Sequence, residues 1–330
     1  MSTGRSVRFC SVALACLIAT LSQFASAAEV QLRMGHSGQT TEPLQILGNK
    51  WAELLAEQAK GKLSMKVYPQ GQLGDDKSLV EQLRLGTVDV TMVPADVLVG
   101  SIPEMAVIGL PFAFNTYAEA HRFLDGPGGK MLLAKLSAIG LIGVGFVDTG
   151  FRSIGTTSRP IRTPDDLKGL KIREIPSPVV LDTINALSGN AVPIPWAETV
   201  SALKQGLVDG VGTTPAFFYS AQLWDYTKYF SYTQHLYTAN VALISAKSFE
   251  RLPPDLQKTL LATGVAAVDY TRKYVADLDA RVAGELKAKG VIVNTVDSSL
   301  FRSRVEGVWR SYEPKIGPEL MGYLRASVAK

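Results

Sequence analysis

Two arginines stand at positions from which they could hold an anion. Arg173 ends the strand-like segment 169–172, and Arg152 directly follows Gly150 and Phe151. Ligands of open α/β sheets bind beyond the carboxyl ends of the strands, which is where Arg173 is expected to lie. A guanidinium offers a rigid fork of donors that matches the two oxygens of a carboxylate. Together they indicate a carboxylate site, although either arginine taken alone is more often a surface charge.

Aromatic residues lie in two places that could form the wall of such a site. Trp196 follows a Pro-Ile-Pro segment, and Phe217, Phe218 and Tyr219 come just after Pro215. Aromatic side chains commonly line ligand clefts and cover the apolar part of a ligand. They are equally suited to a hydrophobic core, and the sequence leaves both interpretations open.

The sequence contains few residues arranged for catalysis or for metal binding. His36, His121 and His235 are far apart and have no acidic partner at ligand spacing, so we expect surface or loop histidines and no metal site. The segment 35–39 begins like a nucleophile elbow but lacks the closing glycine. Ser37 with His36 is therefore the one candidate for a hydrolase, and it is a weak one. The lack of an acid–base set favours a binding protein over an enzyme, and no cofactor is expected.

Composition bounds the class of protein. The chain has 330 residues, of which 46% are hydrophobic and 19% charged. This is enough for two domains with a buried core, and it excludes an intrinsically disordered chain. A net charge of only +4 lacks the strong basic footprint of a nucleic-acid binder, so no nucleic-acid partner is expected.

The first 27 residues are predicted to be a secretory signal peptide. A basic start, an apolar stretch too short to span a bilayer comfortably, and Ala25-Ser26-Ala27 as a cleavage site support this interpretation. An uncleaved anchor helix and lipoprotein processing at Cys16 are the alternatives. Cys10 and Cys16 are the only cysteines, so the mature chain would have neither a disulfide nor a thiolate site. We expect an exported, periplasmic protein.

Strand patterns and helix patterns alternate along the mature chain, which predicts an α/β fold with largely parallel sheets. Strands are expected at 30–34, 63–68, 88–93, 141–147, 170–173, 191–194 and 208–211, and helices at 41–59, 79–85, 179–187 and 198–204. Around 148–150 and 234–239 the chain is extended with few helix signals, as in a protein whose chain passes twice between two lobes.

A long helix is predicted from Pro253 onward. Its apolar face is expected to contain Leu261, Val265, Val268, Val275, Leu278, Val282 and Leu286. About 35 residues at ~1.5 Å each extend for about 50 Å, which is too long for one small domain. This helix is therefore expected to lie across both lobes.

Several motifs, in order over nearly the whole mature chain, resemble those of one family. The chain is similar to the solute-binding proteins of tripartite ATP-independent periplasmic (TRAP) transporters, of the dicarboxylate-binding type. The motifs are Tyr68–Asp76 (YPQGQLGDD), Leu85–Asp89 (LGTVD), Leu110–Phe112 (LPF), Gly150–Arg152 (GFR), Pro164–Arg173 (PDDLKGLKIR) and Ala202–Gly210 (ALKQGLVDG).

The resemblance implies the two-lobe clamshell of class II periplasmic binding proteins, with a long interdomain helix. One lobe would comprise residues 28–150 with about 239–278, and the other residues 151–238 with about 279–330. A monomer would capture a small organic acid between the lobes and deliver it to the membrane permease of the transporter. A ligand-binding sensor is the main alternative, and an exported α/β hydrolase a weaker one.

The resemblance also implies roles for individual residues. Arg173 would form the salt bridge with the ligand carboxylate, and Arg152 would assist it. Trp196 would pack on the ligand, His36 and Ser37 would line the other lobe, and Asp76 would meet polar groups of the ligand.

The sequence departs from the family pattern at 209–214 (DGVGTT). Thr213 stands where many members have an asparagine that binds the carboxylate, and Thr214 lies beside it. A hydroxyl donates one hydrogen bond where the amide offers two. With Trp196, Phe217 and the apolar pair Val93 and Pro94, this change favours a smaller or more apolar acid over a highly hydroxylated sugar acid.

Overall fold

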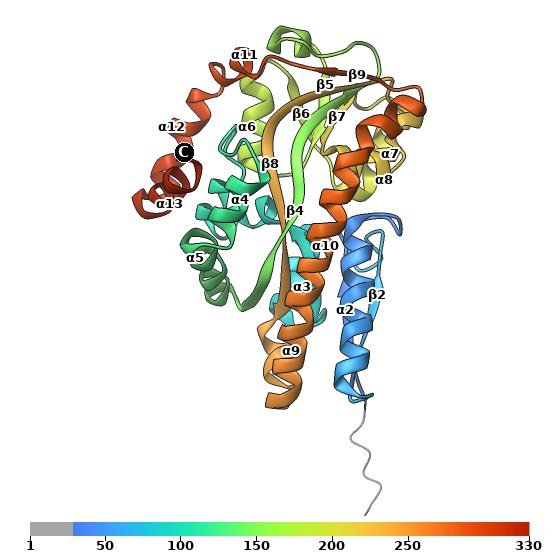
Figure 1. Ribbon diagram of the computed structural model, residues 1–330, viewed down its shortest axis with the longest axis vertical. Helices are drawn as coiled ribbons and strands as arrows, with labels where there is room; N and C mark the ends of the chain where they lie inside the picture. The colour runs from blue at the N-terminus through green and yellow to red at the C-terminus, as the bar shows by residue number, and fades with distance from the viewer. Residues whose placement is uncertain (1–28, 330) are drawn as a thin grey trace, which may run out of the picture.

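The computed structural model describes residues 29–329 and forms two lobes stacked along the long axis of the molecule (Figure 1). The predicted signal peptide, with Cys10 and Cys16, lies outside the described residues. Across residues 29–329, none of the helices combines the length and the apolar character that crossing a bilayer requires.

The first lobe is built on three parallel strands, β1 (Val30–Gly35), β2 (Leu63–Tyr68) and β3 (Val90–Pro94), with β1 between the other two. Helix α2 (Pro43–Ala59) packs on this sheet through the buried Trp51. Helix α3 (Asp76–Leu85) begins where Asp75 accepts a hydrogen bond from the Ser78 amide. It ends at Gly86, whose left-handed backbone closes the helix.

The second lobe repeats this plan with β5 (Lys171–Glu174), β6 (Asn190–Pro193) and β7 (Gly210–Thr213), in which β5 lies between its two parallel partners. Helices α6 (Pro178–Ala186), α7 (Thr199–Lys204) and α8 (Pro215–Ser220) connect or cover these strands. Proline in the first turn of α6 and α8 suits the helix start, where a backbone N–H has no partner within the helix.

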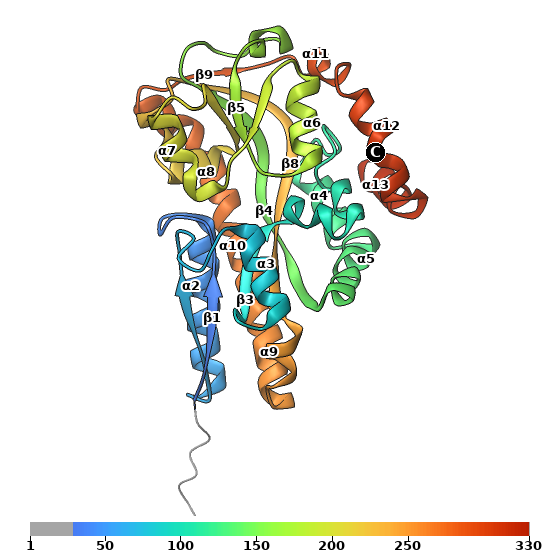
Figure 2. The same ribbon diagram turned by 180° about the vertical axis from the view of Figure 1, so that it is seen from behind.

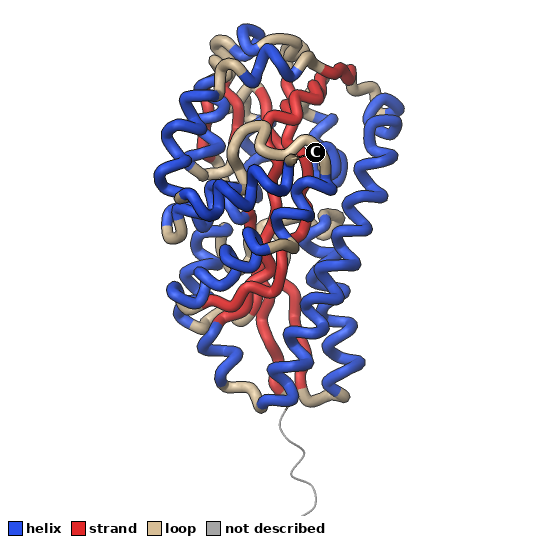
Figure 3. Tube along the Cα trace, turned by 60° about the vertical axis from the view of Figure 1, so that its left-hand side comes forward, coloured by secondary structure: helices blue, strands red, loops and turns tan. Residues whose placement is uncertain are grey.

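Two long strands join the lobes. β4 (Leu141–Thr156) and β8 (Tyr229–Ser245) pair antiparallel over most of their length and contain both stretches predicted to pass between lobes. Figure 3 shows them running through the middle of the molecule between layers of helices. The described strands form one sheet of order β2-β1-β3-β8-β4-β7-β5-β6, and a ninth strand, β9 (Ile292–Thr295), pairs with β8. The expectation of largely parallel sheets is therefore wrong at the centre, because the crossing strands run in opposite directions.

The crossing point of β4 contains a bulge between Asp148 and Gly150. Gly150 has a φ of +110°, and a Cβ there would lie 2.7 Å from the Tyr117 hydroxyl. Only glycine suits this combination of backbone conformation and close approach.

The predicted long helix is α10 (Pro254–Ala288), which runs diagonally past both lobes (Figure 1). The expected apolar face is correct except at Val265, which is 47% exposed, whereas Leu261 is partly buried against the core. There the helix packs on α2, and Gly264 faces the Trp51 ring, where a Cβ would lie only 2.5 Å from the ring. Because of this close approach, the side of the helix that contains Leu260 and Gly264 faces α2.

The C-terminal elements contact both lobes. After α10 come β9 (Ile292–Thr295), α11 (Ser298–Arg302), α12 (Glu306–Ile316) and α13 (Pro318–Val328). Helix α12 packs on α6 of the second lobe and on the turn at Pro103–Val107, whereas α13 packs on α4 (Tyr117–Leu124) and α5 (Pro127–Lys135) of the first lobe, as Figure 2 shows from behind. We therefore propose the predicted two-lobe division with one change, that residues 306–328 form a strap across the lobes.

The shorter elements complete the chain. Helix α9 (Ala246–Glu250) follows β8, and single 3₁₀ turns occupy Ala95–Gly100, Pro103–Val107, Leu136–Ile139, Pro164–Leu167, Trp196–Glu198 and Leu223–Asp225.

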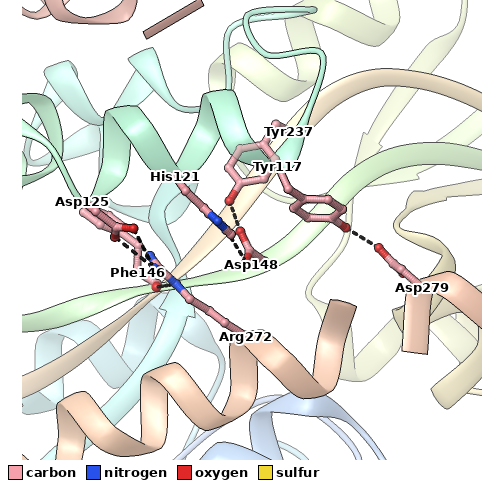
Figure 4. A network of polar contacts seen from close by, with 8 residues as sticks. All are labelled: Tyr117, His121, Asp125, Phe146, Asp148, Tyr237, Arg272 and Asp279. Carbon is pink, nitrogen blue, oxygen red and sulfur yellow. Dashed lines mark hydrogen bonds and ion pairs between the residues drawn. The ribbon is translucent and has the colours of Figure 1, made fainter. Parts of the chain in front are cut away.

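A polar network ties the crossing strands to α4 and α10 (Figure 4). The Tyr117 hydroxyl donates to Asp279 of α10, and the Tyr237 hydroxyl donates to Asp148 at the bulge. His121 also bonds Asp148, with its Nε2 2.7 Å from Oδ2. These contacts join the first lobe to the second half of α10, so the network lies at the junction of the lobes.

The predicted environment of the histidines needs correction. His121 has an acidic partner, Asp148, that is distant in sequence and was not visible from spacing. His36 and His235 are fully buried, and burial lowers the pKa of His36 to about 4 and that of His235 to about 3. Both are buried and neutral. His36 lies in the loop after β1, as the expectation allowed, whereas His235 lies within β8 and is neither a surface nor a loop residue.

Candidate functional site

A cavity lies where the two lobes meet the crossing strands. Its empty volume is about 420 Å³ when the mouth that opens to solvent is included. The lining residues from the first lobe are Ser37, Leu44, Asp76 and Pro94, those from the second are Arg152, Arg173, Ile175, Trp196, Thr213 and Phe217, and those from the crossing strands are Thr149, Thr238 and Asn240.

Arg173 is the free cation of this cavity. It lies near the end of β5 and is 1% exposed, yet no carboxylate of the described residues lies within ion-pair distance. Its Nε donates to the Ile194 carbonyl over 2.8 Å, and its Nη1 is buried without a protein partner. Burial, with the nearby charge of Arg152, lowers the pKa of Arg173 to about 9. The guanidinium is thus buried, charged at neutral pH and able to bind an anion.

Arg152, unlike Arg173, has a carboxylate partner. Its Nη2 donates to the Glu174 carboxylate and to the Gly212 carbonyl. Both members of the ion pair are buried. Burial raises the pKa of Glu174, while the two arginines act in the opposite direction. Arg152 therefore supports the cavity floor with its charge already compensated.

Trp196 forms one wall of the cavity. Its ring lies against the Arg173 guanidinium, with 5.1 Å between the guanidinium carbon and the ring centroid, and meets Phe217 edge to face. Its Nε1 donates to Glu42 Oε2 over 2.8 Å. Ser37 and Trp196 also line a second cavity, so the indole borders both.

The first lobe opposes Arg173 with a polar surface that includes an acid. Asp76, at the start of α3, has its Oδ1 buried without a protein partner. Burial raises its pKa to about 6, although a hydrogen bond with Ser37 and the charge of Arg173 act against this shift. At neutral pH the cavity therefore has a cation on one side and a largely ionised carboxylate on the other.

The structure brings most of the predicted site residues together. Arg173, Arg152, Trp196, Thr213, Ser37, Asp76 and Phe217 all line the cavity. His36 and Thr214 do not. The His36 Nε2 bonds Gln45 over 3.2 Å, and the Thr214 hydroxyl caps α8 by accepting from the Phe217 amide.

The remaining aromatic and hydrolase candidates also have defined positions. Phe218 belongs to the core of the second lobe, and Tyr219 packs on Trp224 outside the cavity. Ser37 and His36 make no hydrogen bond with each other within residues 29–329, so the pair that a hydrolase would need is not formed.

Several important residues were not identified from the sequence. Thr149 and Thr238 lie in the two stretches predicted to cross between lobes, so their position carried a usable signal, and Asn240 follows closely. Glu174 directly follows Arg173 in the sequence. Its ion pair with Arg152 depends on the tertiary fold, because β4 and β5 are brought together by pairing with opposite sides of β7. Glu42 has no local motif that separates it from an ordinary residue at a helix start.

Known proteins share both the sequence pattern and the fold. Residues 34–315 match the family model DctP, described as bacterial extracellular solute-binding protein, family 7. The 2,3-diketo-L-gulonate-binding periplasmic protein of Escherichia coli (strain K12) is 31% identical over 319 residues, covering 96% of this chain and 97% of that protein.

Two solved structures illustrate the range of ligands among similar proteins. The sugar acid binding protein of Advenella mimigardefordensis, in complex with galactonate, has a TM-score of 0.87 and 30% identity, covering 91% of this chain and 98% of that one. A TRAP periplasmic solute-binding protein of Sulfurospirillum deleyianum, with bound succinate, has a TM-score of 0.86 and 26% identity, covering 92% and 100%. The predicted family and two-lobe α/β fold are thereby confirmed.

Proposed function

Because the chain belongs to the bacterial extracellular solute-binding proteins of family 7, we propose that it captures an organic carboxylate in the cavity between its lobes for a TRAP transporter. Similar proteins bind galactonate or succinate. The single observation that carries the proposal is the buried Arg173, whose Nη1 lacks a protein partner. A ligand carboxylate would satisfy the donor and compensate the charge, as buried cations require.

We propose that residues 1–27 direct export to the periplasm and are then removed. The mature protein binds its ligand as a monomer and presents the closed form to the membrane permease. Ligand binding would close the lobes, because a ligand that touches both sides of the cavity stabilises the closed state over the open one.

We propose, further, that the ligand is a hydroxylated monocarboxylate, because of the charges and polar groups that line the cavity. Arg173 is the cavity cation left uncompensated, and Asp76 opposes it, so a second carboxylate would meet a like charge. Ligand hydroxyls instead find acceptors and donors in Asp76, Ser37 and Asn240. This proposal revises the expectation of a more apolar acid, which rested on the aromatic wall and did not include the polar residues of the crossing strands.

A series of four-carbon acids tests the function and the ligand class together. Isothermal titration calorimetry of the mature protein with D-erythronate, butanoate and succinate varies only the hydroxyls and the second carboxylate. We expect D-erythronate to bind most tightly and succinate least tightly. If succinate bound more tightly than D-erythronate, the hydroxylated class would be wrong. If no acid in the series or in a wider panel bound, the proposed function would fail.

A further inference from the structure

Glu42 is a buried acid that bonds across the lobes without lining the cavity. It directly precedes α2 in the first lobe and is fully buried. Its Oε2 accepts the hydrogen bond from Trp196 Nε1, whereas Oε1 is buried with no protein partner. Glu42 occupies the N-cap position of α2, but its side chain makes no capping bond, so it does not serve the helix.

The contact fixes the wall of the ligand cavity. The 2.8 Å bond to Glu42 holds the indole of Trp196 between Arg173 and Phe217. A second bond crosses the lobes beside it, from the Thr41 hydroxyl to the Ser220 carbonyl over 2.9 Å. If the lobes separate, the Trp196 bond must break and the Glu42 carboxyl becomes exposed to water.

Charged groups around Glu42 come from several elements. The negative charge of Asp76 on α3 disfavours ionisation of Glu42, whereas the positive charge of Arg173 on β5 favours it. The Arg152–Glu174 ion pair lies beyond Arg173. His36, after β1, is neutral, and Glu198 on the turn that contains Trp196 is exposed.

Burial outweighs these charges and raises the pKa of Glu42 from its ordinary 4.5 to about 8. Gly38 preserves the close packing on this carboxyl, because a Cβ there would lie 2.6 Å from Oε2.

We propose that Glu42 is a positioning residue of lobe closure, which enters the closed protein as a neutral acid, so that ligand binding takes up a proton. This rests on the proposed function only in that a ligand closes the lobes. In the open form a solvated Glu42 is ionised at neutral pH, and in the closed form the indole N–H and the buried surroundings hold the protonated carboxyl.

The sign of the pH effect follows from the two states. The closed form binds one more proton than the open form wherever the pH lies between the two pKa values of Glu42. Ligand affinity therefore falls as the pH rises, by up to about tenfold per pH unit between roughly pH 5.5 and 7.5. Asp76, whose pKa is raised to about 6, contributes mainly below pH 7.

Calorimetry at pH 7 in buffers of different ionisation enthalpy counts the protons directly. With D-erythronate, or the tightest ligand of the carboxylate panel, we expect the wild type to take up about one proton per ligand. In Glu42→Gln, which keeps an oxygen acceptor for the indole but cannot titrate, the uptake falls to near zero and affinity varies little with pH. The control Glu198→Gln removes an exposed carboxylate nearby and should leave the uptake unchanged.

The outcomes separate this proposal from the proposed function. Binding without proton uptake by the wild type would overturn the role of Glu42 while leaving carboxylate capture intact, and this measurement needs no variant. Full uptake retained by Glu42→Gln would also overturn it and assign the proton elsewhere. Failure of every carboxylate to bind would remove both proposals.

Discussion

Arg152 and Glu174 neutralise each other at the floor of the cavity, through an ion pair in which both side chains are buried. The pair leaves Arg173 as the cation that lacks a carboxylate partner among residues 29–329. We therefore propose different roles for the two arginines identified from the sequence, a structural role for Arg152 and a ligand-binding role for Arg173. This division determines the charge of the ligand that the cavity can accept.

Replacing Arg173 should abolish most ligand binding. Arg173→Ala removes the guanidinium fork, and we expect a loss of about 2–5 kcal/mol, or roughly 30-fold to several thousand-fold in affinity. Arg173→Lys keeps the charge but loses the planar geometry and should recover only part of this loss. Calorimetry with D-erythronate measures both. Lys171→Ala, an exposed cation on the same strand, is the control and should bind normally. Affinity of Arg173→Ala within about threefold of wild type would contradict the assignment.

Replacing Asp76 should change selectivity between acids. Asp76→Asn removes the like charge that a second ligand carboxylate would meet, while retaining a group that can bond hydroxyls. At pH 7.5, where Asp76 is ionised, we expect the affinity for succinate to rise about tenfold relative to that for D-erythronate. Butanoate, which lacks both groups, provides the internal reference. An unchanged ratio of the two affinities would show that Asp76 does not face the far end of the ligand.

Adding a methyl group at Gly212 should disrupt the floor of the cavity. A Cβ there would lie 1.6 Å from Glu174 Oε1, so Gly212→Ala forces the buried ion pair apart. We expect a loss of about 1–3 kcal/mol in stability, measured by thermal and urea denaturation, together with weaker binding. Gly284→Ala in α10 is the matched control, because nothing lies within 4 Å of its added Cβ. It should be neutral or slightly stabilising. Equal effects of both substitutions would argue against the close packing.

Removing the Tyr117 hydroxyl should weaken the junction of the lobes. Tyr117→Phe deprives the buried Asp279 of a donor, and its Oδ1 already lacks a protein partner. We expect a loss of about 1–3 kcal/mol in stability. Tyr323→Phe removes an exposed bond to Glu319 and is the control, with an expected effect below about 0.5 kcal/mol. If both variants melted at the wild-type temperature, the Tyr117–Asp279 bond would be unimportant for stability.

The order of elements was predictable because it rests on local patterns. The alternation of strands and helices, the length of α10 and the extended crossings each follow from periodicity within one segment. The inward turn at Gly264 was not predictable, because it depends on the Trp51 ring of another helix. The antiparallel centre of the sheet likewise depends on how distant strands meet.

The candidate site shows the same limit. Arg173 was identifiable from its place at the end of a strand, and the family resemblance assigned it the carboxylate. The compensation of Arg152 by Glu174 and the contact of Glu42 with Trp196 join residues that are 22 and 154 positions apart. Such tertiary pairs determine which charged side chains lack a partner, and they cannot be predicted from the spacing of residues in a single sequence.

The pairing of β4 with β8 constrains how the two halves can move. Because paired backbone crosses from one half to the other, interrupted only by local register shifts such as the one between Asp148 and Gly150, we expect the halves to move by twisting of these strands and not about flexible linkers. Each half shares part of its sheet with the other, so neither is expected to fold when expressed alone.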